Sequence, residues 1–407
     1  MIHSIKVGIS LVLVSLLYLL DPLYEQVGEN AMWAIMTVVV IFEFSAGATL
    51  SKGLNRGMGT IVGGGLGCII AILAQKLSGG VGSNYYILIA GISIFIFGAI
   101  ATYFRTFPSI KKRYEYGVMI FILTFNLVLM SVVREEQQVW EIARDRLLTI
   151  LIGFIISISV SFFFFPLWSS DQFHCSTLSN FQQLAYAIQG CLEDYMRFAN
   201  NEKENEEAAT TNFTFCKSLM NSKAKDELLA SYAKWEPWHG KFGFSYPWQN
   251  YLKIGDLNRD LAAIILALRT CLQASKKPME LQSWSETIQL IEPCCEEIGS
   301  NVMWTLKELG ESMKQMRKIH ASQISTNLKA SRAEISMVVM MNIFTFNKIA
   351  TLSILNNNYD EDDNNASQLA IASFLFLLKE VVNKVEELTK EVEQLGDIAC
   401  FPTHIQL

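Results

Sequence analysis

The sequence predicts an all-α membrane protein, in which six transmembrane helices are followed by a helical cytosolic domain. Three observations indicate this fold class. Hydrophobic residues make up 51% of the 407 residues, too many for a single soluble domain of this length. Residues 1–168 divide into apolar runs close to the roughly 20 residues that cross a hydrocarbon core. Residues 169–407 have ordinary charge density, a helical apolar period and few strand signals.

The membrane half is expected to contain spans at 2–20, 31–50, 57–75, 85–104, 116–133 and 146–168. The first run lacks a basic leader and a small-residue cleavage site, so it is a retained helix and not a signal peptide. The connections "SKGLNR" and "RTFPSIKKRYE" are rich in Lys and Arg, which favours the cytosolic side. Six crossings then place both termini in the cytosol.

The third span carries a glycine pattern. Gly59, Gly63 and Gly67 recur every four residues, a spacing typical of membrane helices that approach one another closely. The segment "GTIVGGGLGCII" lacks the Gly-Lys-Ser/Thr ending of a phosphate-binding loop. We therefore expect helix packing at this stripe and no phosphate site.

The second half, residues 169–407, contains three well-marked helical stretches. They are "NYLKIGDLNRDLAAIILALRTCLQ", the region 278–320 with a kink expected at Pro293, and "LAIASFLFLLKEVVNKVEELTKEVEQL". The run at 336–355 is apolar but broken by Asn342, Asn347 and Lys348. A seventh crossing there is the less favoured alternative.

Several classes of function are disfavoured. A net charge of −6 argues against nucleic acid as a partner. The eight cysteines include no CxxC pair, and no His cluster has metal-ligand spacing, so neither a metal site nor a disulfide framework is expected. No nucleophile motif with a His–carboxylate partner is present, so we expect neither an enzyme nor a cofactor.

What remains is a set of cations at the ends of the predicted spans. Cations at both mouths of a helical bundle would attract anions. Juxtamembrane Lys and Arg can instead set orientation or bind anionic membrane lipid, and Arg144 and Arg146 can pair with neighbouring acids. Both alternatives stay open. The candidate residues of an anion pathway are Arg56, Lys111, Lys112, Arg113, Arg144 and Arg146.

A carboxylate, Glu43, lies inside the second predicted span, beyond mid-membrane toward its cytosolic end. An unpaired charge at that depth is costly, so Glu43 is expected to be the intramembrane partner of a pore arginine. Two rival functions remain. A proton-coupled organic or aromatic acid exporter would use Glu43 as its titrating group, and a membrane-anchored scaffold would carry no current.

Four blocks of the sequence resemble the plant aluminium-activated malate transporter family. They are "WAIMTVVVIFEFSAGATLSKGLNRGMGTIVGGGLG", "YEYGVMIFILTFNLV", "RLLTILIGFIISISVSFFFFPLWSSDQFH" and "WEPWHGKFGFSYPWQNYLKIG". The resemblance implies a homodimeric channel for malate and other anions in the plasma or vacuolar membrane. It also implies a cytosolic domain carrying the motif Trp235, Glu236 and Pro237, and basic residues that shape the anion pathway.

Two departures from the family accompany the resemblance. The chain begins almost at its first apolar run, without the longer leader usual in the family, which suggests missing regulatory sequence or a shortened gene product. The apolar run at 336–355 replaces a segment that is generally polar and variable. The resemblance therefore implies nothing about regulation through either region.

Overall fold

The computed structural model confirms the all-α fold class. It describes residues 2–20, 31–78, 84–134, 139–199, 206–274, 281–322, 324–337 and 361–402, and within these ranges it contains helices and no strand. The chain folds as two compact units, Met1–Asp171 with Tyr232–Phe244, and Gln172–Ser231 with Ser245–Leu407. The predicted division at 168/169 assigned the Trp-Glu-Pro motif to the second half. The structure groups that motif with the first unit.

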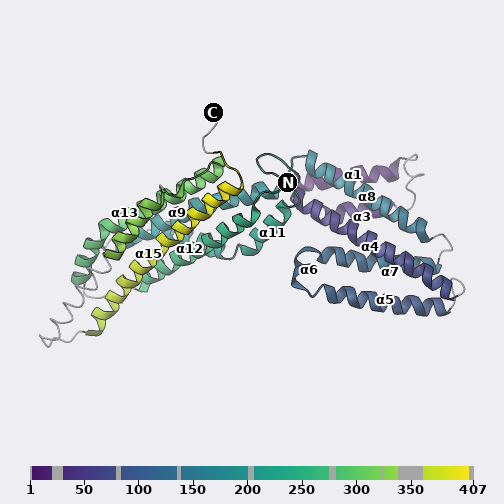
Figure 1. Ribbon diagram of the computed structural model, residues 1–407, viewed down its shortest axis with the longest axis horizontal. Coiled ribbons are helices and arrows are strands. Elements are labelled where there is room, and N and C mark those ends of the chain that lie inside the picture. The colour runs from purple at the N-terminus through teal and green to yellow at the C-terminus, as the bar shows by residue number, and fades with distance from the viewer. Residues whose placement is uncertain are drawn as a thin grey trace. The chain divides into compact units, whose positions relative to one another are not determined.

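The first unit is a bundle of apolar helices (Figure 1). Helix α4 packs most extensively against α7 and then against α8; α3 and α1 pack against α8 and against each other, and α5 lies on α4 and α7. The short helix α6 joins the ends of α5 and α7. The helices are α1 (Ile2–Leu19), α3 (Ala31–Ile41), α4 (Ala46–Ser78), α5 (Asn84–Phe104), α6 (Pro108–Arg113), α7 (Glu115–Arg134) and α8 (Val139–Phe163).

Three helices of the described residues are long and apolar enough to cross a membrane: Ala46–Ser78, Asn84–Phe104 and Arg144–Phe163. Shorter apolar helices lie at Ile2–Leu16, Met32–Ile41 and Glu115–Ser131. These six segments coincide in order with the expected spans. Six crossings, and the orientation derived from the basic loops, stay predictions.

The expected loop at 51–56 is wrong. Helix α4 runs without interruption from Ala46 to Ser78, and the reversal of the chain lies at 42–45, after α3 ends at Ile41. The polar and glycine residues of "SKGLNR" are held in the helix by packing. Gly53 lies against the ring of Phe154 from α8, and Asn55 donates a hydrogen bond to the carbonyl oxygen of Arg113 at 3.1 Å.

The glycine stripe is confirmed as a packing surface. A Cβ atom at Gly63 would lie 2.7 Å from the carbonyl oxygen of Phe121 on α7, and one at Gly67 would lie 3.1 Å from Cβ of Val128. At Gly59 the same atom would collide with the carbonyl oxygen of Gly117. Because backbones meet this closely, α4 and α7 form the most intimate helix pair of the first unit.

The second unit is a set of long helices, in which α15 packs along α12 and α13, and α10 packs on α12 (Figure 1). The expected helices are present, and Pro293 lies inside α13. The run at 338–360 lies outside the described residues, so the seventh crossing is untested. The helices are α9 (Ser169–Ala199), α10 (Glu206–Met220), α11 (Lys223–Ala233), α12 (Trp248–Ala274), α13 (Leu281–Gln315) and α15 (Glu361–Ile398).

Candidate functional site

Arg56 is the most deeply buried of the five candidate cations whose side chains the structure describes. It lies on α4, about 15 Å from the start of that helix at ~1.5 Å per residue, and is 4% exposed. Its Nη1 donates to the hydroxyl of Tyr116 at 3.2 Å, and its Nε is buried without an acceptor in the described part of the chain. No carboxylate of the described residues forms an ion pair with it. A buried guanidinium with one neutral partner leaves several donors for a ligand.

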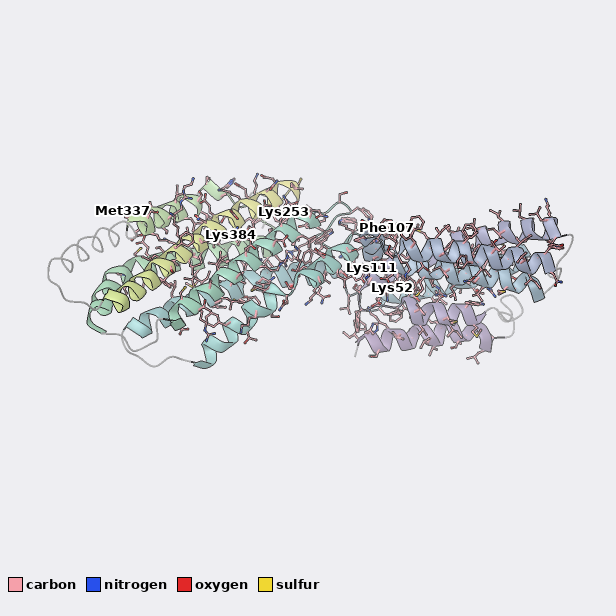
Figure 2. All side chains as sticks on the ribbon, turned by 90° about the horizontal axis from the view of Figure 1, so that it is seen from below. Lys52, Phe107, Lys111, Lys253, Met337 and Lys384 are labelled. Atoms are coloured by element: carbon pink, nitrogen blue, oxygen red, sulfur yellow. The ribbon has the colours of Figure 1, made fainter. Side chains whose placement is uncertain are left out.

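The basic segment of α6 lies at one end of the first unit. Lys111 and Arg113 are exposed, and the guanidinium carbon of Arg113 lies 5.5 Å from the ring centroids of both Tyr114 and Trp235. Figure 2 shows Lys111 and Lys52 at the same end of the first unit, in agreement with the hydrogen bond between Asn55 and Arg113. The side chain of Lys112 lies outside the described residues.

The two arginines of α8 lie far from the end of the first unit that carries α6 and the start of α4. Arg146 lies about 26 Å before the end of α8, at ~1.5 Å per residue. The residues just after α8 contact the start of α4, because Ala46 N–H donates to the carbonyl oxygen of Leu167 at 2.9 Å. The guanidinium of Arg146 lies 4.9 Å above the ring of Trp33. Arg144 is exposed and donates to Asp145 at 3.0 Å, as the ion-pair interpretation expected.

The structure changes the interpretation of Glu43. Glu43 lies in the connection between α3 and α4, because α3 ends at Ile41, so it is not inside a helical span. Its carboxylate forms an ion pair with Lys52, one to two helical turns into α4, and not with an arginine. The side chains are 27% and 35% exposed, so the pair is only partly removed from solvent. The predicted arginine partner is wrong, and the partner that the structure describes is this lysine.

The Trp-Glu-Pro motif is anchored in the first unit through its carboxylate. The side chain of Glu236 is 1% exposed. It accepts hydrogen bonds from the backbone N–H groups of Ser169 and Ser170, at 2.6 and 3.1 Å, and from the hydroxyl of Ser170 at 2.6 Å. These N–H groups belong to the first turn of α9, where no intrahelical acceptor exists. Glu236 therefore caps α9 from a segment distant in sequence.

Aromatic and glycine contacts complete this junction. The ring of His239 stacks on that of Trp168 with a centroid distance of 3.8 Å, and its Nδ1 donates to the carbonyl oxygen of Pro237 at 2.8 Å. A Cβ atom at Gly47 would lie 2.5 Å from the carbonyl oxygen of Tyr232 and 2.8 Å from Glu236. Burial, and to a lesser degree the charge of Glu43, raise the pKa of Tyr232. Segment 232–244 is thus packed closely onto the start of α4.

Sequence reasoning missed a buried lysine. Lys6 on α1 is 2% exposed and lies inside the first expected span. The sequence signal for it was that Lys6 and Ser10, in "IHSIKVGISLVLV", are four residues apart and therefore lie on the same face of an apolar helix. Sequence reasoning also missed Tyr116 and the capping serines 169 and 170, because their roles arise from contacts between distant segments.

Comparison with known proteins gives a consistent answer. A sequence profile described as "Aluminium activated malate transporter" matches residues 1–367. Aluminum-activated malate transporter 13 of Arabidopsis thaliana is 39% identical over 345 residues, covering 83% of this chain and 62% of that protein. Aluminum-activated malate transporter 12 of the same plant is 40% identical over 338 residues, covering 83% and 58%. Aluminum-activated malate transporter 1 of Triticum aestivum is 32% identical over 405 residues, covering 98% and 82%.

The lengths of these proteins differ from that of the chain. The chain spans about 60% of the first relatives it matches, with coverages of 62%, 60% and 58%. It spans 75% of Aluminum-activated malate transporter 2 of Arabidopsis thaliana, at 35% identity. The names of these relatives describe transporters and not enzymes.

Proposed function

The chain belongs to the aluminium-activated malate transporter family, and from that premise we propose that it is an anion channel of a plant membrane, conducting malate and other organic or inorganic anions. The proposed path is lined by basic residues of the first unit, and the working assembly is a homodimer. Its membrane is the plasma membrane or the vacuolar membrane.

One observation carries this proposal: Arg56 is buried and has no acidic partner among the described residues. A charge that is 4% exposed is costly unless a counter-charge compensates it, and the described residues supply only the hydroxyl of Tyr116. A transient anion would provide the missing counter-charge. Because guanidinium groups donate to carboxylates in a fork geometry, Arg56 suits an organic acid as well as a halide.

A single arginine is expected to bind an anion with the moderate affinity that conduction requires. A pore site must attract an anion strongly enough for entry and weakly enough for release. A single arginine with a hydroxyl partner offers one full charge, whereas paired arginines would hold a dicarboxylate firmly. Lys111 and Arg113, exposed at one end of the unit, would raise the local anion concentration at the entrance by Coulomb attraction.

The rival exporter receives less support. A titrating carrier group must lose its partner during each cycle, and Glu43 already has an ion pair with Lys52 at the chain reversal. Glu43 lies in the connection at 42–45 and the pair is partly solvated, which suits a structural role more than proton transfer through the membrane.

The test is voltage clamp of oocytes that express the wild-type chain, Arg56→Gln or Lys76→Gln, with malate, nitrate and chloride exchanged on each side. Lys76 is a matched control because it is an exposed cation on the same helix. We expect reversal potentials that follow the anion gradient, a current reduced about tenfold in Arg56→Gln, and no change in Lys76→Gln. Surface abundance is measured by biotinylation in all three.

Two outcomes would contradict the proposal. Wild-type protein at the surface that carries no anion-dependent current would favour a scaffold. Saturable malate flux that follows a proton gradient, and is lost in Glu43→Gln, would favour the exporter.

A further inference from the structure

A second buried cation lies on α1, away from Arg56 and its partner. His3, Lys6, Ser10 and Val14 follow one another at spacings of three or four residues, so they share one face of the helix. Lys6 is 2% exposed, and Ser10 and Val14 are fully buried. In the described residues α1 packs against α3 and α8, and the ring of His3 stacks on that of Phe44 at 4.2 Å. This face therefore points into the first unit.

The polar groups of this face have no protein partner within the part of the chain that the structure describes. Lys6 forms no ion pair or hydrogen bond there, and both Ser10 Oγ and His3 Nδ1 are buried without one. A buried ammonium group without a counter-charge is strongly disfavoured. Here one buried ammonium group lies within about one helical turn of two other polar atoms, Ser10 Oγ and His3 Nδ1, that also lack partners in the described residues.

The helices that pack on α1 carry buried hydroxyls, and their acids are confined to the start of α8. Helix α3 contains no Asp or Glu, and α8 contains none after Asp145, which is paired with Arg144. The buried hydroxyls of these helices are Thr37 on α3 and Ser157 and Ser161 on α8. Hydroxyls of Thr37 and Ser157 already donate to the backbone of their own helices. Among the described residues, α3 and the part of α8 after Asp145 supply no carboxylate for Lys6, and Glu43, between the two phenylalanines on which His3 packs, is paired with Lys52.

We propose that Lys6, with Ser10 one turn further along, is an anion-binding point for a small dissolved carboxylate or halide that enters the first unit. This proposal rests on the proposed anion channel and adds a position on α1 to its path. The ammonium group supplies the charge, and the Ser10 hydroxyl is a donor on the same face. His3 lies one turn before Lys6 and provides a further polar atom at the same place.

A structural lysine and a ligand-binding lysine respond differently to replacement. Replacing a buried, unpaired ammonium by an apolar side chain of similar length removes a desolvation cost. Lys6→Met is therefore expected to fold at least as well as the wild type while losing function. A lysine that only supports the fold would show the reverse, with reduced surface abundance.

The first experiment compares unitary anion currents and surface abundance of Lys6→Met, Lys6→Arg and the control Lys76→Met. We expect a unitary malate or chloride current at least threefold smaller in Lys6→Met, near wild-type current in Lys6→Arg, and no effect of Lys76→Met. Thermal stability of purified protein in detergent should be unchanged or higher in Lys6→Met, and its increase on adding malate should be smaller.

A second experiment restores the charge. Lys6→Cys is treated with a cationic methanethiosulfonate reagent, which should return current, or with an anionic one, which should not. Malate should slow the reaction, because it occupies the same place. Wild-type protein treated in parallel controls for the eight native cysteines.

The outcomes separate this inference from the proposed channel. Normal current in Lys6→Met at wild-type abundance would overturn the inference, as would absence of Lys6→Met from the surface, which would assign Lys6 to folding. Malate that does not slow modification of Lys6→Cys would also overturn it. A silent wild type would instead reject the channel itself.

Discussion

Glu236 and Arg56 are both ionisable side chains that are almost fully buried in the first unit, but they differ in how many hydrogen-bond partners the protein gives them. Glu236 accepts hydrogen bonds from two backbone N–H groups and one hydroxyl, whereas Arg56 donates to a single phenol. Lys6 has still fewer partners among the described residues. A charge that the protein satisfies contributes to the fold, and a charge that it leaves unsatisfied is available to a ligand. The first unit therefore contains one buried carboxylate that the protein satisfies and buried cations that it does not, and we propose that these cations bind anions.

The largest expected effect is a loss of stability when Glu236, the carboxylate with three hydrogen-bond donors, is replaced. Glu236→Ala leaves the N–H groups of Ser169 and Ser170 buried without an acceptor, which should lower the free energy of unfolding by about 3 kcal/mol or more. Thermal unfolding of purified protein and surface abundance measure this loss. The control Glu311→Ala removes a carboxylate of α13 whose side chain is 45% exposed and whose hydrogen-bond partners in the described residues, Lys314 and Gln315, lie in the same helix, so both measurements should change little. Equal stability of the two variants would break the comparison.

The next effect concerns the close approach that lets Glu236 reach α9. Gly47→Ala places a Cβ atom 2.5 Å from the carbonyl oxygen of Tyr232, so we expect a loss of about 2 kcal/mol in stability. Gly57 is the matched control, since it lies on the same helix and a Cβ atom added there would meet no atom within 4 Å. Gly57→Ala should stabilise the helix by about 0.5–1 kcal/mol. Effects of the same sign would argue against tight docking of segment 232–244.

A smaller effect, on anion current, is expected when Arg56 loses its hydrogen-bond partner Tyr116. Tyr116→Phe removes the hydrogen bond that orients Arg56, and such bonds contribute about 1–2 kcal/mol. We expect anion conductance to change about two- to tenfold while stability changes little, because Arg56 keeps its charge. Unitary current and thermal unfolding of the same preparation give the two readouts. A stability loss without a change in current would place Arg56 among the structural charges.

The smallest effect is expected at the partly exposed pair. Glu43→Gln removes a single ion pair of partly solvated side chains, which should cost less than about 1 kcal/mol. Anion current should be close to that of the wild type. Because Lys52 would then lack its partner, Lys52→Met combined with Glu43→Gln is the control that separates lost pairing from an unpaired lysine. Loss of proton-dependent flux in Glu43→Gln would instead return this residue to a transport role.

Several parts of this picture follow from the sequence. The apolar runs predicted the order of the apolar helices, the three amphipathic stretches predicted α12, α13 and α15, and the stripe of Gly59, Gly63 and Gly67 predicted a close helix pair. The candidate cations at 56, 111, 113, 144 and 146 are also visible in the sequence before any contact is known. These features are local, because hydrophobic period and residue size act within one helix.

Other parts arise only from tertiary contacts. The chain reverses at 42–45 and not at 51–56, because Gly53 and Asn55 pack against α8 and α6 and are stable inside a helix. The pairing of Glu43 with Lys52 follows from that reversal. The capping role of Glu236 and the burial of Lys6 depend on segments far apart in the sequence. Composition and period determine which residues form helices, but whether a buried charge finds a partner is decided by the neighbouring helices that folding places around it.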